Sequence, residues 1–120
     1  MRPLSKDEHL RKAENNKAFA RSIKGTDPTS IGWVLVAAFY SALHFVDAFG
    51  EKYNTHFSSH AQRNEEVQKN PQLVKLRDDY RDLCTLGWNA RYTNQNYGIK
   101  EHKQALESLA VVESAIRTLL

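Results

Sequence analysis

The chain has 120 residues, of which 41% are hydrophobic and 26% are charged, and its formal net charge is +3. This length is enough for one domain and too short for two ordinary ones, and the composition is that of a globular protein rather than a disordered one. Because Cys84 is the only cysteine, an intrachain disulfide and a zinc site built on a cysteine pair are excluded. We therefore expect a single domain over residues 1–120.

Positive charge is concentrated at the start of the chain. Residues 1–24 hold seven Lys or Arg and three Asp or Glu, which gives +4, and the other residues sum to −1. A basic first helix suits a phosphate backbone or an acidic partner, although a solvated amphipathic helix has the same pattern. The start of the chain has no apolar run typical of a secretory signal, and the apolar run over 31–46 is shorter than the roughly 18 residues of a membrane span. A cytoplasmic protein without a membrane segment is expected.

Helix-start and helix-stop signals recur along the first half of the chain, and no strand pattern competes with them. The sequence SKDE at the start of the first helix, over about 5–24, is a capping box. Gly25 suits a helix end, and Asp27 followed by Pro28 suits a new start. The second helix, over about 28–53, is apolar nearly all round for four turns and should be the central helix.

The second half predicts three more helices. A second capping-box pattern, SHAQ, opens a short polar helix over 59–69. One long helix follows to residue 92, and the last runs over about 100–119. Four long helices and a short one, joined by short connections, predict an all-α, up-and-down bundle. The residues expected to face the core on the last two helices are Leu73, Leu76, Tyr80, Leu83 and Gly87, then Ala105, Leu109, Val112, Ile116 and Leu119.

A polar stripe crosses the apolar second helix. Tyr40, His44, Asp47 and Glu51 follow one another at spacings of four, three and four, so they share one face. His44 is either a buried histidine bonded to Asp47 or Tyr80, or an active-site group whose tautomer is set by a neighbouring carboxylate. No second His or Cys stands at the spacing of a zinc motif, so no metal is expected.

Two further segments carry candidate binding groups. His60 and Arg63 share a face in the first turn of the short helix, which Ser59 begins. Free backbone N–H groups and the helix dipole favour an anion there, and arginine matches phosphate geometry, although an exposed polar helix explains the same pattern. Arg91 and Tyr92 end the fourth predicted helix, where Arg91 either caps carbonyls or faces the polar stripe.

Three segments in this order resemble a known family. WVLVAAFYSALHFVDAF, SSHAQR and LRDDYRDLCTLGWNARY, within about residues 30–92, are similar to short stand-alone members of the HEPN superfamily of all-helical, RNA- or nucleotide-associated domains. The resemblance implies a helical bundle that often forms a homodimer. Many such domains are metal-independent endoribonucleases of toxin–antitoxin or anti-phage systems. It therefore implies RNA or a nucleotide as ligand, no cofactor, and an antitoxin or neighbouring defence protein as partner.

The sequence departs from the best-known motif of that family, which is an arginine, four to six residues and then a histidine. The one formal match is Arg2 to His9, and this composition produces about one such match by chance. No arginine in residues 72–92 has a histidine at the required distance. The usual catalytic route is therefore in question.

Other residues could replace the missing motif, because metal-free RNA cleavage needs a base, a cation for the phosphate and an acid. The alternative is a non-catalytic dimeric interaction module, or an antitoxin or adaptor subunit, whose His/Arg cluster is structural. The expected catalytic residues are His44, His60, Arg63 and Arg91, and the expected substrate-binding residues are Tyr40, Asp47, Ser59 and Tyr92.

Overall fold

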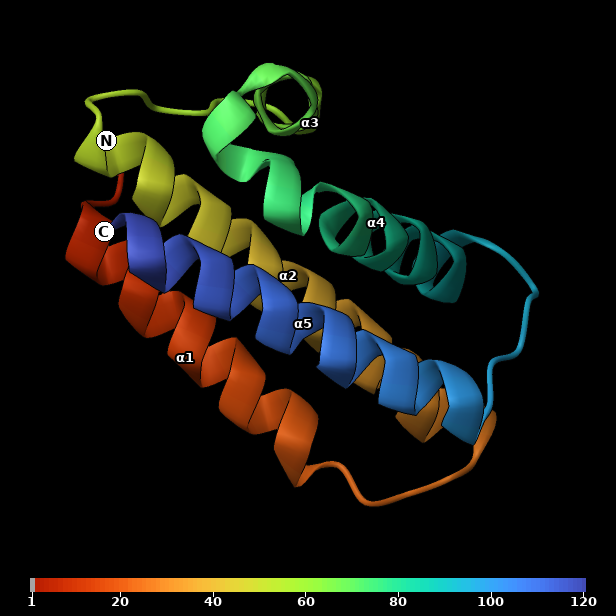
Figure 1. Ribbon diagram of the computed structural model, residues 1–120. Coiled ribbons are helices and arrows are strands. Elements are labelled where there is room, and N and C mark those ends of the chain that lie inside the picture. Colours follow the sequence, from red (N-terminus) through yellow and green to blue (C-terminus); the bar gives the residue numbers. More distant parts are fainter. Residues whose placement is uncertain (1) are drawn as a thin grey trace.

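The computed structural model describes residues 2–120, and within them it contains helices and no strand (Figure 1). The predicted all-α class is therefore confirmed. Five α-helices follow one another, with a 3-10 helix between the third and the fourth. Their bounds are α1 Lys6–Ser22, α2 Pro28–Lys52, α3 His60–Lys69, η1 Pro71–Leu76, α4 Arg77–Tyr92 and α5 Ile99–Leu119.

The predicted start signals form at the first two helices. The Ser5 hydroxyl accepts the Glu8 N–H at 3.2 Å, and the Glu8 carboxylate accepts the Ser5 N–H at 2.9 Å, which completes the capping box. The Asp27 carboxylate accepts the Ser30 N–H at 3.1 Å and so begins α2. These bonds satisfy backbone donors that have no partner inside the helix.

Three boundary predictions were wrong in part. Helix α1 ends at Ser22. The residue that caps this end is Ile23, whose backbone is extended, so Gly25 is not the cap. Ser59 caps α3 by accepting the Gln62 N–H at 3.0 Å, but the Gln62 side chain accepts the N–H of Ser58 instead of Ser59. The segment expected to start the fourth helix forms η1, a tighter helix typical of short connections, and α4 begins only at Arg77.

Helix α2 is the centre of the fold and packs against α1, α4 and α5. Figure 1 shows α1, α2 and α5 lying along one another, whereas α3 is seen end-on and therefore crosses them. The predicted core positions of η1, α4 and α5 are buried, except that Leu119 is half-buried. On α2 itself Trp33 departs from the expected burial, because 57% of it is exposed.

Helix α2 also has the length and composition of a membrane span. However, 61% of its most apolar window is buried inside the bundle, and the core helix of a soluble protein passes the same test. Its burial agrees with the predicted central helix.

Helices α1 and α2 approach closely because small residues line their contact. Ala13 is fully buried, and the buried Ser41 hydroxyl donates to the Ala13 carbonyl at 2.7 Å. Ala20 and Ala37 pack together farther along the same pair of helices. This close approach brings side chains of α1 within reach of the polar stripe on α2.

Candidate functional site

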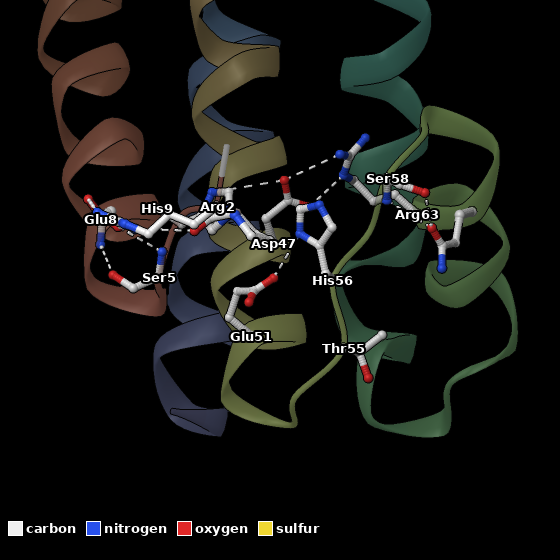
Figure 2. A network of polar contacts seen from close by, with 12 residues as sticks. Arg2, Ser5, Glu8, His9, Asp47, Glu51, Thr55, His56, Ser58 and Arg63 are labelled. Carbon is white, nitrogen blue, oxygen red and sulfur yellow. Dashed lines mark hydrogen bonds and ion pairs between the residues drawn. The ribbon is translucent and has the colours of Figure 1, made fainter.

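A buried polar cluster, made of His9, His44, Asp47 and Arg63, joins three helices. His9 on α1 faces α2, and its Nδ1 lies 3.0 Å from Nδ1 of His44 and 4.0 Å from a carboxylate oxygen of Asp47. Figure 2 shows Asp47 between His9 on one side and Arg63 of α3 on the other. His9, Asp47 and Arg63 are 4%, 6% and 6% exposed, so this cluster lies almost entirely within the protein.

Asp47 holds Arg63 through two hydrogen bonds. Arg63 Nε donates to Asp47 Oδ1 at 2.6 Å, and Nη2 donates to Oδ2 at 3.2 Å. The remaining terminal nitrogen, Nη1, lies 3.3 Å from Nδ1 of His60, one helical turn back. The anion site expected around Arg63 at the start of α3 is therefore taken by a carboxylate of the chain itself, and a phosphate would have to displace Asp47.

Burial keeps the two facing histidines neutral. It lowers the pKa of His44 to about 4, with a further lowering by His9 that the Asp47 carboxylate offsets only in part. Burial also lowers the pKa of His9, against the opposing effect of Asp47. At pH 7 the pair is therefore uncharged, and the contact between the two Nδ1 atoms is a hydrogen bond with a single proton.

The predicted partner of His44 was wrong, since it is His9 rather than Asp47 or Tyr80. His9 was missed because its helix was interpreted by its charge. A signal was present: His9, Ala13 and Ala20 recur at helical spacing, and they are the buried residues of α1. The Arg2–His9 motif does not form a site, because Arg2 is exposed and pairs with Glu8 at 2.6 Å.

A separate depression, which we call the His60 groove, lies between α2, α3 and α4. It has a volume of about 330 Å³. Trp88 and Tyr92 are 57% and 62% exposed, and their ring centroids are 4.5 Å apart. The residues that line this groove include Phe39, His60, Cys84, Trp88, Arg91 and Tyr92.

Arg91 is fixed at one side of the groove by contacts that match both predicted alternatives, since it faces the stripe of α2 and also donates to a carbonyl of its own helix end. Its Nη1 donates to the Tyr40 hydroxyl at 2.6 Å, and its Nε donates to the Gly87 carbonyl at 3.1 Å. The guanidinium carbon lies 5.3 Å from the ring centroids of Phe39 and Tyr40 and 5.0 Å from that of Tyr92. These are cation–π distances, and no carboxylate competes for this charge among its hydrogen-bond partners in residues 2–120.

His60 is the histidine that opens to the groove. Its ring centroid is 6.1 Å from that of Phe39. Partial burial lowers the pKa of His60, and the positive charges of Arg63 and Arg91 lower it further. A neutral imidazole beside a fixed guanidinium can accept a proton from a bound hydroxyl while the cation holds a phosphate.

The predicted site residues thus separate into two groups. His60, Arg91 and Tyr92 line the groove, and Tyr40 holds Arg91. The others serve the fold around the groove: Ser59 caps α3, Asp47 and Arg63 form the buried pair, and His44 pairs with His9.

Comparison of the chain with protein-family models, with curated proteins and with solved structures finds no match.

Proposed function

We propose that the chain is a HEPN-like protein that binds single-stranded RNA, or a nucleotide, in the His60 groove. The observation that carries this proposal is the combination of an exposed Trp88–Tyr92 pair with the carboxylate-free guanidinium of Arg91. Aromatic side chains stack on unpaired bases, and each stacked base contributes about 1–3 kcal/mol. Arginine binds the phosphates that connect those bases. Both features lie along one groove.

We further propose that His60 cleaves the bound RNA without a metal. The neutral imidazole takes the proton of a ribose 2′-hydroxyl, and the 2′-oxygen forms a bond to phosphorus while the bond to the 5′-oxygen breaks. The proton on His60 then passes to the departing 5′-oxygen, directly or through water. Arg91 stabilises the charge on the phosphate oxygens. The products are a 2′,3′-cyclic phosphate and a 5′-hydroxyl.

Binding and cleavage are tested separately. Fluorescence anisotropy with a labelled single-stranded RNA should show at least a tenfold weaker Kd for Arg91→Met, because that variant removes the phosphate partner. His60→Gln should bind as the wild type does and lose cleavage, measured on a denaturing gel. Arg81→Met is the matched control, since Arg81 is an exposed arginine of α4 that pairs with Asp78. Wild-type protein that binds no RNA, or an Arg91→Met variant that binds unchanged, contradicts the proposal.

A second candidate is favoured by the buried pair. Arg63 and His44 make their polar contacts inside the bundle, as a structural cluster does. In this alternative the chain is a non-catalytic dimeric module, or an antitoxin or adaptor subunit, and the groove receives a protein partner. Absence of RNA binding and cleavage by purified wild type, together with copurification of a neighbouring gene product, favours it over the nuclease.

The remaining features of the proposal are the sequence-based expectations for topology and location and the dimer that the family resemblance implies. We propose an up-and-down order of α1, α2, α4 and α5, a homodimer and a cytoplasmic location. The reversal of chain direction between successive long helices in Figure 1 supports the first of these. Light scattering of the purified chain tests the dimer.

A further inference from the structure

The facing histidines of α1 and α2 lie outside the proposed RNA site and close to a carboxylate. His9, His44 and Asp47 each offer one donor atom, and these three atoms lie within 4.8 Å of one another. His44 and Asp47 are three residues apart and share a face of α2, while His9 comes from the opposite helix. The cluster therefore converges from two elements, as the ligands of a metal site do.

The distances suit a small divalent cation. Donor atoms bound to tetrahedral zinc at about 2.0–2.1 Å are about 3.3 Å apart. The two Nδ1 atoms are 3.0 Å apart, and Nδ1 of His9 is 4.0 Å from the Asp47 carboxylate. Small rotations of the side chains close these differences. Two imidazoles with a carboxylate form a nitrogen-rich donor set that suits zinc and its neighbours better than Mg²⁺ or Ca²⁺.

The contact between the two rings also suits a cation. A metal needs an unprotonated nitrogen from each histidine. A hydrogen bond between two neutral rings places one proton between two lone pairs, whereas a cation would use both lone pairs.

Arg63 does not prevent this use of Asp47. Its shorter bond, 2.6 Å, goes to Oδ1, while Oδ2 is 3.2 Å from the guanidinium and is the oxygen nearest to His9. A carboxylate that binds a metal through one oxygen commonly accepts a hydrogen bond as well. Because His44 is only half-buried, a cation could enter from its side, and water could complete the coordination.

We propose that His9, His44 and Asp47 form a zinc site that ties α1 to α2. The metal stabilises the contact between α1 and α2. It takes no part in RNA cleavage, because Arg63 lies between these ligands and the His60 groove. This inference is independent of the proposed function. Chelation should lower the thermal stability of the protein, while RNA cleavage by the folded protein continues in EDTA.

The test uses the full chain without a histidine tag, stripped with EDTA and dialysed. Titration with Co²⁺, which reports zinc-like coordination through its visible absorption, should give an intense tetrahedral spectrum that saturates at one ion per chain. Zn²⁺ should abolish that spectrum by competition and raise the Tm. His9→Gln and His44→Gln should each weaken Co²⁺ binding at least tenfold. His102→Gln, which changes a half-buried histidine at the start of α5, should bind as the wild type does.

Three outcomes overturn the proposal. The first is wild-type protein that gives no saturating Co²⁺ spectrum and no Tm rise with Zn²⁺. The second is unchanged binding by both His9→Gln and His44→Gln, which would mean adventitious binding at surface side chains. The third is loss of binding in His102→Gln. Circular dichroism checks the fold of each variant, and His44→Gln decides if His9→Gln fails to fold, because His44 is the less buried of the two.

Discussion

The buried cluster and the His60 groove use the same residue types in opposite surroundings. In the cluster, Arg63 is 6% exposed and is held by both oxygens of Asp47. In the groove, Arg91 is held by the Tyr40 hydroxyl and lies against aromatic rings. The Asp47 carboxylate neutralises the charge of Arg63 inside the protein. The guanidinium of Arg91 has no carboxylate among its hydrogen-bond partners in the described chain.

This difference indicates a structural role for Arg63 and a binding role for Arg91. A buried arginine with a matched carboxylate costs much to disrupt but offers nothing to a ligand. An arginine beside exposed aromatic side chains contributes little to folding and can still bind a phosphate.

The largest effect should come from Asp47→Asn, which leaves the Arg63 guanidinium buried with an uncharged partner. Removing one member of a buried ion pair costs about 3–5 kcal/mol, so we expect a loss of about 3 kcal/mol in the free energy of unfolding by urea, measured in EDTA. The matched control is Asp78→Asn, because Asp78 forms an exposed ion pair with Arg81 at 3.2 Å. We expect that variant to lose about 0.5 kcal/mol or less of unfolding free energy. A loss below about 1 kcal/mol for Asp47→Asn would contradict the structural role of the pair.

Gly87→Ala should disturb the groove and leave the cluster in place. A Cβ at Gly87 would lie 2.9 Å from Cβ of Phe39, so α4 would have to move away from α2. Overpacking of this kind costs about 1–3 kcal/mol, and RNA binding should weaken as Arg91 and Phe39 separate. Gly32→Ala on α2 is the control, because nothing lies within 4 Å of the added Cβ. That change should stabilise the helix by about 0.5–1 kcal/mol.

Tyr40→Phe should have a smaller effect, confined to the groove. The change removes the hydroxyl that accepts from Arg91 at 2.6 Å and leaves the ring in place. We expect a three- to tenfold weaker Kd for single-stranded RNA, and a loss of unfolding free energy of about 1 kcal/mol, the usual contribution of one hydrogen bond. Equal Kd values for variant and wild type would mean that Tyr40 does not orient Arg91.

The smallest effect concerns the reactivity of Cys84, which is half-buried beside the groove. Burial raises the pKa of its thiol to about 11. Because the thiolate is the reactive form, the rate of alkylation by iodoacetamide should still increase about tenfold per pH unit between pH ~8 and ~9.5, where an ordinary thiol with a pKa of about 8.5 levels off. Bound RNA should slow the reaction. A plateau near pH ~9 would contradict the burial of this thiol.

The local signals in the sequence predicted much of the fold. The Ser5 and Asp27 caps, the central α2 and the buried seam from Leu73 to Gly87 depend on spacing within one helix, which the sequence displays directly. His9 and His44 are 35 residues apart in the chain, and their pairing depends on how α1 lies against α2. No periodicity within one helix contains that information.

The candidate site shows the same limit. Spacing correctly placed His60 and Arg63 on one face and Arg91 opposite the α2 stripe. It could not show that Asp47 binds Arg63, because the two residues belong to different helices, and that contact decides which arginine is left for a ligand. The exposed Trp88 was likewise absent from the predicted binding residues. Spacing along one helix does not show whether an apolar residue beside the buried seam lines a groove.

The two tryptophans allow the most direct test of the central claim, which is that RNA binds in the His60 groove. Trp33 and Trp88 are both 57% exposed, but only Trp88 lines the groove. Trp33 lines two depressions at the start of α2, one of which also includes Arg91. The indole N–H signals of both tryptophans can be followed by NMR as a single-stranded RNA is added. We expect the Trp88 signal to shift to saturation while the Trp33 signal shifts much less. A shift of Trp33 alone, or of neither signal, would contradict the claim.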